Sequence, residues 1–151
     1  MTDESPDRTP ETWRGVDVTR TGSGRFEARN QRGGVLSFGS GDDTDFSPVE
    51  LFLAALAGCA AVTVEEVTSR HAIPTTFAVS GEGHKIRDDG GQHMVDLKVS
   101  FEVTFPDGPG GDRARKVLPR AVQQTHDRIC TVSRTVEIGE PVEYALADGD
   151  D

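Results

Sequence analysis

The segment Ser47-Pro-Val-Glu-Leu-Phe-Leu-Ala-Ala-Leu-Ala-Gly-Cys59 opens the longest apolar run of the chain and decides how the rest folds. Ser47 suits the N-cap of a helix, because its hydroxyl can accept a hydrogen bond from a free backbone N–H one turn inside. Pro48 suits the first helical position, and Glu50 completes a capping box with Ser47. The sequence therefore predicts a helix that begins at Pro48 and ends before Pro74.

This helix is apolar on nearly all sides, so we expect it to be buried on several of them. Its apolar run is shorter than the roughly 20 residues that span a bilayer, and we expect no membrane association. Cys59 lies in the middle of the helix between two small residues, Gly58 and Ala60. A second backbone or a small ligand can therefore approach its sulfur, which is the first sign of chemistry in the chain.

The composition favours an acidic protein with one domain. The chain has 151 residues, with 16 Lys and Arg against 26 Asp and Glu, for a formal net charge of -10. This charge argues against binding to nucleic acid or to anionic membrane surfaces. The polar, acidic N-terminus does not resemble a signal peptide, so we expect a cytoplasmic protein. With 2 cysteines in total, no disulfide framework supports the fold, and the pair is either core filler or redox-active.

The remaining patterns predict an α+β domain. We expect a disordered tail over residues 1–12 and a single domain over 13–147. Alternating residues and turn signals predict strands over 13–20, 25–30, 35–38, 76–86, 95–105, 132–138 and 142–146. The run from Val95 to Phe105 has the clearest alternation, and Asp88-Asp-Gly-Gly91 predicts a tight hairpin before it.

A second helix is predicted between the fifth strand and the last two. Asp112 is expected to cap it, and Cys130 to lie at its far end. Pro119 is expected to kink this helix or to delay its start. The predicted order is β-β-β-α-β-β-α-β-β, and its short turns imply mostly antiparallel strands with the helices packed on them.

Cys59 and Cys130 are the candidate reactive residues. One interpretation is that both are small buried hydrophobes, as free cysteines often are. The alternative is a redox pair, because two thiols held on helices suit an attacking thiolate and a resolving thiol. An attacking thiolate needs a lowered pKa, which a nearby cation normally provides. The candidate cations are Arg25, His126, Arg128 and Arg134.

Other site types have little support. The histidines show no zinc spacing, so we expect no metal site. Hydrolase nucleophile, P-loop and dinucleotide motifs are missing, so we expect no cofactor. Glu50 lies nine residues before Cys59, on roughly the opposite side of the helix, which favours its capping role, whereas the apolar Val49 lies nearer the sulfur.

Two motifs resemble the OsmC/Ohr family of osmotically inducible and organic-hydroperoxide-resistance proteins. The segment from Pro48 to Cys59 resembles the signature helix of the family, and Ile129-Cys130-Thr-Val-Ser133 resembles its second-cysteine motif. The resemblance covers roughly residues 13–146. It implies an OsmC-like fold with antiparallel sheets wrapped around two central helices, in an intertwined homodimer.

The resemblance also implies a thiol peroxidase, an oxidoreductase that acts on organic hydroperoxides. Cys59 would then be the peroxidatic thiolate, and Cys130 would condense with its sulfenic acid to form a disulfide. A dithiol reductant of the lipoyl type would reopen that disulfide. Arg25, in the early hairpin, is the best match to the activating arginine of the family, although Arg20 and Arg29 are close to it in the sequence.

The chain departs from the best-characterised branch of the family directly after the motif proline. That branch has a glutamate there which orients the arginine, whereas this chain has Val49. Glu50 instead matches a second, poorly characterised branch with the motif Pro-x-Glu-Leu. Either Arg25 lacks its carboxylate partner, or Glu50 reaches the site across the dimer.

Three hypotheses follow. The first is a hydroperoxide reductase that uses Cys59, Cys130, Arg25 and Glu50. The second is a non-catalytic dimer of the same fold that binds a small apolar ligand between its subunits, with Cys59 as a wall residue. The third is a thiol-dependent transferase of acyl groups or disulfides.

Overall fold

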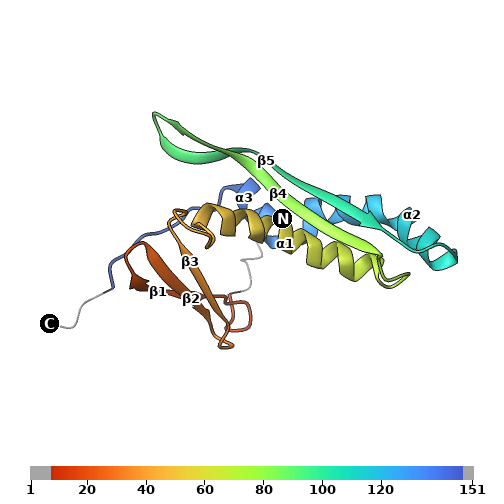
Figure 1. The fold of residues 1–151 in the computed structure, drawn as a ribbon, viewed down its shortest axis with the longest axis horizontal. Helices are drawn as coiled ribbons and strands as arrows, with labels where there is room; N and C mark the ends of the chain where they lie inside the picture. The colour runs from red at the N-terminus through yellow and green to blue at the C-terminus, as the bar shows by residue number, and fades with distance from the viewer. Residues whose placement is uncertain (1–7, 148–151) are drawn as a thin grey trace, which may run out of the picture. The chain divides into compact units, whose positions relative to one another are not determined.

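The computed structural model describes residues 8–147, drawn in colour in Figure 1. Its elements are β1 (Val16–Gly22), β2 (Arg25–Asn30), β3 (Val35–Gly39), α1 (Pro48–Thr68), β4 (Thr76–Asp88), β5 (Gly91–Thr104), α2 (Pro109–Gln124), the π-helix η1 (Thr125–Ile129) and α3 (Thr131–Ile138). All strand pairs are antiparallel, which confirms the α+β class.

The chain forms two compact units, one up to Leu51 and the other from Phe52 onward. The single domain over 13–147 therefore stays a prediction. Of the predicted tail, residues 1–7 lie outside the described residues, and residues 10–12 form an exposed turn.

The first unit contains a three-stranded sheet in the order β1-β2-β3. Its second turn is closed by the side chain of Asn30, which accepts hydrogen bonds from the backbone N–H groups of Arg32 and Gly34. Phe26 and Phe38 stack on adjacent strands with their ring centroids 5.7 Å apart. The three predicted strands are confirmed, although the first begins at Val16 and not at residue 13.

The start of α1 follows from its capping box. The backbone N–H of Ser47 donates to Oε2 of Glu50 at 2.8 Å, and Oγ of Ser47 accepts from the N–H of Glu50 at 3.3 Å. These reciprocal bonds satisfy donors that a helix otherwise leaves without partners. The predicted start at Pro48 is confirmed, and the helix ends at Thr68, before Pro74.

The burial of α1 differs from the expectation. Its buried residues form one stripe with helical spacing: Leu56, Ala57, Ala60, Val64 and Thr68. Within this single chain the opposite side is open, and Val62 is 70% exposed. Burial on several sides is therefore wrong for the isolated chain.

The length of α1 also exceeds the apolar run from which it was predicted. With 21 residues, it is the one helix among the described residues that is long and apolar enough to cross a membrane. The length of α1 therefore does not exclude a membrane span, as the shorter apolar run in the sequence had suggested. Core helices of soluble proteins meet the same criterion, so length and composition do not decide the matter.

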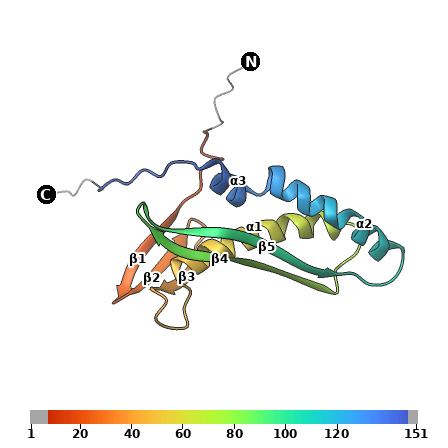
Figure 2. The same cartoon turned by 90° about the horizontal axis from the view of Figure 1, so that it is seen from above.

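The second unit contains the long β4–β5 hairpin, which runs along α1 in both views (Figures 1 and 2). A Cβ atom on Gly81 of β4 would lie 2.7 Å from the backbone oxygen of Leu53, so the strand and the helix are in close contact there. The predicted alternation in β5 is interrupted once. Asp96, with φ 53°, and Leu97 together lie opposite the single residue Gly83, which forms a β-bulge.

The second predicted helix begins earlier than expected. Its N-cap is Gly108 and its first residue is Pro109, whereas Asp112 lies in the first turn and pairs with Arg115. The capping role of Asp112 is therefore wrong, because Pro109 already fixes the backbone angle of the first position. The helix continues through Pro119 to Gln124, so the start is not delayed. The π-helix η1 then leads to Cys130.

The predicted closing hairpin is wrong. Residues 131–138 form the helix α3, because both of its ends are capped locally. Cys130 caps its N-terminus, and Gly139 ends it in the left-handed conformation, with φ 65° and ψ 45°. Residues 140–147 have no regular structure, and Tyr144 is 93% exposed there.

We predict that Gly81→Ala destabilises the protein by about 1–3 kcal/mol, because its methyl group would overlap the Leu53 carbonyl. Urea denaturation measures the change in the free energy of unfolding. The neighbouring Ser80→Ala, at an exposed position of the same strand, is the matched control and should stay within about 0.5 kcal/mol. Equal effects of the two substitutions would contradict close packing of β4 on α1.

Candidate functional site

The fold brings Cys59 and Cys130 together from two different helical segments of the second unit. Cys59 lies on α1 and is half-buried, whereas Cys130 lies between η1 and α3 and is 1% exposed. The two thiols lie close enough that each shifts the pKa of the other. Neither thiol is in a disulfide within the described residues, so the structure presents the reduced pair.

Both sulfurs lie at the N-terminus of α3. Sγ of Cys130 accepts a hydrogen bond from the backbone N–H of Ser133 at 3.5 Å. The nearby backbone N–H groups of Val132 and, to a lesser degree, Thr131 lower the pKa of the Cys59 thiol. The first N–H groups of a helix have no partner inside it and carry partial positive charge. The first turn of α3 is therefore a site for one negative charge, shared between two thiols.

The surroundings favour Cys130 as the carrier of that charge. Burial raises the pKa of Cys59, and contact with Cys130 raises it further, against the opposing effect of the backbone N–H of Val132. Burial also raises the pKa of Cys130, but the neighbouring side chain and backbone N–H of Ser133 and the thiol of Cys59 lower it by more. The net pKa of Cys130 is below its ordinary value, and that of Cys59 is above it.

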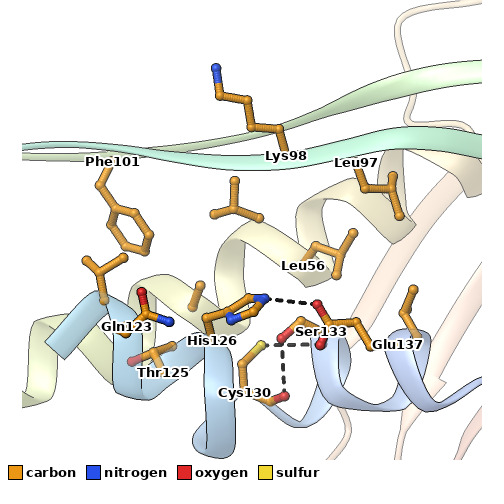
Figure 3. Close-up of a pocket in the computed structure, with 14 residues that line it drawn as sticks. Leu56, Leu97, Lys98, Phe101, Gln123, Thr125, His126, Cys130, Ser133 and Glu137 are labelled. Atoms are coloured by element: carbon orange, nitrogen blue, oxygen red, sulfur yellow. Dashed lines mark hydrogen bonds and ion pairs between the residues drawn. The ribbon is translucent and has the colours of Figure 1, made fainter. Parts of the chain in front are cut away.

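A pocket of about 330 Å³ opens beside Cys130, and it is lined mostly by apolar side chains of α1, β5, α2 and α3 (Figure 3). Leu56 and Phe101 contribute to its walls, and Cys130 and Ser133 lie together at one side of it. Cys59 is not among the lining residues. A small apolar molecule in this pocket would therefore meet the sulfur of Cys130.

Thr125 adds an unusual polar group to the same wall. The residue is 2% exposed, and its hydroxyl has no hydrogen-bond partner among the described residues. A buried hydroxyl without a partner is costly, by about 1–3 kcal/mol. A ligand with a polar end could supply the missing hydrogen bond.

His126 connects η1 to α3 at the edge of the pocket. Its Nδ1 lies 2.8 Å from Oδ1 of Asp127. Its Nε2 lies 2.9 Å from Oε1 of Glu137 (Figure 3). Ionised carboxylates only accept hydrogen bonds, so both ring nitrogens must carry protons to make the two bonds. Hydrogen bonds to Asp127 and then to Glu137 accordingly raise the pKa of His126. The imidazolium ties the segments on either side of Cys130 to each other.

Arg25 and Glu50, the other predicted catalytic residues, belong to the first unit and have local partners. The guanidinium of Arg25 forms ion pairs with Asp43 and with Asp45, the latter at 2.9 Å. The carboxylate of Glu50 accepts from the backbone N–H of Ser47. Their roles at the thiols stay predictions. Over residues 8–147, no group of three or more His, Cys, Asp or Glu side chains is placed to hold a metal ion.

Three site residues were missed by the sequence reasoning. Ser133 lies three residues after Cys130. An N-cap side chain commonly accepts a hydrogen bond from the backbone N–H at that spacing, so the sequence did contain a signal for this contact. It was overlooked because the segment was predicted to be a strand. Thr125 and Glu137 gave no local signal, since their importance depends on how η1 and α3 pack.

Comparisons with known proteins agree with this fold. A family model described as OsmC-like protein matches residues 41–145. Uncharacterized proteins of Mycobacterium tuberculosis and Mycobacterium bovis are 29% identical over 133 residues, covering 87% of this chain and 94% of theirs.

Several solved structures share the fold at low sequence identity. A hypothetical protein from Aquifex aeolicus has a TM-score of 0.66 at 15% identity, covering 83% of this chain and 88% of its own. An OsmC-like protein of unknown function from Vibrio cholerae has a TM-score of 0.63 at 13% identity, covering 83% and 94%. The organic hydroperoxide resistance protein OhrB of Bacillus subtilis has a TM-score of 0.50 at 21% identity, covering 82% and 90%.

We predict that the His126 ring titrates above the ordinary histidine value and that Glu137→Gln lowers its midpoint, because one of its two carboxylate partners is lost. A raised folded-state pKa means that these contacts stabilise the fold fully below the unfolded value of about 6.5. That stabilisation is lost as the pH rises through the folded-state pKa.

NMR titration of the histidine ring protons measures the midpoint. Glu143→Gln, in the exposed C-terminal segment, is the matched control and should leave the His126 midpoint unchanged. An unchanged midpoint in Glu137→Gln would contradict the contact.

Proposed function

Because this chain belongs to the OsmC-like family, we propose that it reduces organic hydroperoxides with the Cys59–Cys130 pair. A structural neighbour named as an organic hydroperoxide resistance protein supports a peroxide-related role. The observation that carries the proposal is the placement of both thiols near the N-terminus of α3, with Cys130 lining an apolar pocket. A helix N-terminus stabilises a thiolate, which is the form that attacks a peroxide.

The reaction requires two thiols and no cofactor. One thiolate attacks the distal oxygen of the hydroperoxide, the O–O bond breaks, and an alcohol leaves after taking up a proton. The resulting sulfenic acid condenses with the second thiol to form a disulfide and water. An external dithiol of the lipoyl type then reduces the disulfide. The family resemblance assigns the attack to Cys59, with Arg25 and Glu50 assisting, and the resolution to Cys130.

We also propose that the protein is a homodimer. Large apolar side chains are exposed on the single chain, including Val62 on α1, Val142 and Tyr144. Large apolar side chains left exposed on a single chain are typical of a surface that another chain covers. A cytoplasmic location accompanies this proposal, since free thiols persist in a reducing compartment.

A second candidate function is binding of a small apolar ligand without turnover. The pocket beside Cys130 favours it, because a volume of about 330 Å³ and mostly apolar walls suit a small molecule. Under this alternative the cysteines are wall residues, and a bound ligand leaves without chemical change.

We predict that the reduced protein consumes cumene hydroperoxide in the presence of dihydrolipoamide, and that the double variant Cys59→Ser, Cys130→Ser does not, because it has no sulfur nucleophile. Loss of peroxide measures the rate, and circular dichroism confirms that the double variant is folded. Equal consumption by both proteins would contradict the peroxidase. Binding of intact cumyl alcohol without any turnover by the wild type would favour the second candidate.

We predict a solution mass of twice the 16.2 kDa of one chain. Val62→Glu should shift the protein toward the single-chain mass, because it introduces a charge on the open side of α1. Size-exclusion chromatography with light scattering measures both masses. Glu65→Gln, at another exposed position of α1, is the control. A wild-type mass of one chain at all concentrations would contradict the dimer.

A further inference from the structure

We infer that the pocket beside Cys130 is the binding site of an uncharged organic oxygen compound, and that the hydroxyl of Thr125 forms the hydrogen bond that selects it. The inference rests on the proposed function for the identity of the compound, which is a hydroperoxide or the alcohol formed from it. It concerns the pocket and its polar wall, and it is independent of which thiol reacts with the peroxide.

The hydroxyl of Thr125 differs from those of three other helical threonines. In Thr63, Thr68 and Thr135 the hydroxyl donates to the backbone oxygen four residues earlier. The equivalent oxygen for Thr125, on Ala121, accepts from the Thr125 backbone N–H, whereas the hydroxyl bonds to nothing among residues 8–147. The side chain therefore does not form the local hydrogen bond that a helix offers to threonine.

Thr125 is also the exception among the polar side chains that line the pocket. Within the part of the chain that the structure describes, each of the others has a hydrogen-bond or ion-pair partner: Lys98, Gln123, His126, Ser133 and Glu137. A buried hydroxyl without a partner is unfavourable for folding. A ligand oxygen in the pocket would remove this penalty, since a hydroxyl can both donate and accept.

The hydroxyl can turn toward the pocket without a change in the backbone. Its oxygen is buried in the structure, so contact with a ligand requires rotation of the side chain. Threonine occupies two χ1 rotamers in helices, and its hydroxyl and methyl groups are similar in size. Exchange of the two groups therefore leaves the packing of η1 nearly unchanged and presents the oxygen to a molecule in the pocket.

The rest of the pocket fits the apolar part of such a compound. Its volume of about 330 Å³ lies at the small end of the range for ligand pockets. Phe101 projects from β5 toward the helices, and Leu56 of α1 adds a second wall (Figure 3). The other apolar wall residues are Ala60, Leu97, Val99, Val122 and Val136. These walls can bury a compact ring or a short branched chain.

The charges around the pocket favour an uncharged ligand. The imidazolium of His126 is held between the carboxylates of Asp127 and Glu137. The ammonium of Lys98 pairs with Glu82, and its side chain extends away from the other labelled residues (Figure 3). Among the described wall residues, no cation is thus left to neutralise a carboxylate, and an ionic group without a counter-ion is costly in an apolar site. The ligand oxygen is therefore that of a hydroxyl, hydroperoxide or carbonyl group.

The position of Thr125 connects this site to the proposed reaction. Its backbone oxygen accepts from the N–H of Cys130 at 2.9 Å across the single turn of η1. Thr125 and Cys130 thus line the same pocket from the two ends of one helical turn. A hydroperoxide bound to the Thr125 hydroxyl is held at the wall of the pocket that carries a thiol.

The test compares two ligands that differ by one oxygen. Cumyl alcohol, the product of cumene hydroperoxide, and cumene are titrated separately into the reduced protein, and NMR measures the two affinities. We expect Thr125→Val to weaken the binding of cumyl alcohol by about fivefold, because the hydrogen bond is lost, and to change that of cumene by less than about twofold. Thr125→Ser keeps the hydroxyl and should retain the wild-type affinity for cumyl alcohol within about twofold.

Thr68→Val is the matched control. Thr68 is also fully buried in a helix, but its hydroxyl donates to the backbone oxygen of Val64 at 2.9 Å. This variant should bind both ligands like the wild type. The thermal midpoints of the ligand-free variants should move in opposite directions, each by about 2–4 °C. Thr125→Val rises because it removes a hydroxyl without a partner, and Thr68→Val falls because it removes a hydrogen bond.

Three results would overturn the inference. One is an equal loss of affinity for cumyl alcohol and cumene in Thr125→Val, which would mean that the residue only shapes the pocket. Another is a lowered thermal midpoint of Thr125→Val, which would mean that the hydroxyl already has a partner, such as a water molecule or a second subunit. The third is that neither ligand binds to the wild type.

Failure of the proposed function gives a different result. If the wild type consumes cumene hydroperoxide with dithiol present and its KM is unchanged in Thr125→Val, the inference is overturned and the peroxidase stands. If the wild type binds cumyl alcohol through Thr125 but consumes no peroxide, the peroxidase is overturned and the binding site stands.

Discussion

The contact between the first turn of α3 and two sulfur atoms is the interaction on which the site depends. The N–H groups of a first helical turn need acceptors, and here the sulfur of Cys130 accepts from Ser133 while the sulfur of Cys59 lies near the next N–H groups. This position favours one negative charge by a few tenths to about 1 kcal/mol at an exposed helix end, and by more where water is excluded. A second negative charge at the same place is opposed by the first. The titrations of the two thiols are therefore coupled.

This constraint links the fold to the proposed chemistry. Cys59 lies on α1, which the β4–β5 hairpin contacts closely. Cys130 directly follows η1, at the start of α3. A π-helix is uncommon and is frequently found at functional sites, since the extra residue in its turn redirects the side chains that follow. The bridge from His126 to Glu137 holds η1 and α3 together on either side of Cys130. The position of the sulfur is thus fixed by backbone geometry and by one charged side-chain contact.

Much of this arrangement was predictable from local signals in the sequence. The capping box of Ser47 and Glu50 gave the start of α1, and the turn at residues 88–91 gave the β4–β5 hairpin. Local signals failed where the apolar residues fit both the alternation of a strand and the spacing of a helix. Val132, Val136 and Ile138 fit a strand as well as a helix, and the end caps at Cys130 and Gly139 decided for the helix. The open side of α1 was not predictable, because burial depends on which other segments pack against the helix.

The site was predictable only in part, for a related reason. The sequence identified both cysteines as candidates, but which thiol ionises more readily depends on hydrogen-bond donors and burial that exist only after folding. The most direct test is a pH titration of thiolate absorbance in reduced wild type and in Cys130→Ser. The account predicts that one thiolate of the wild type forms below the ordinary thiol pKa and that this step is missing in Cys130→Ser. A low-pH step that survives unchanged in Cys130→Ser would contradict it.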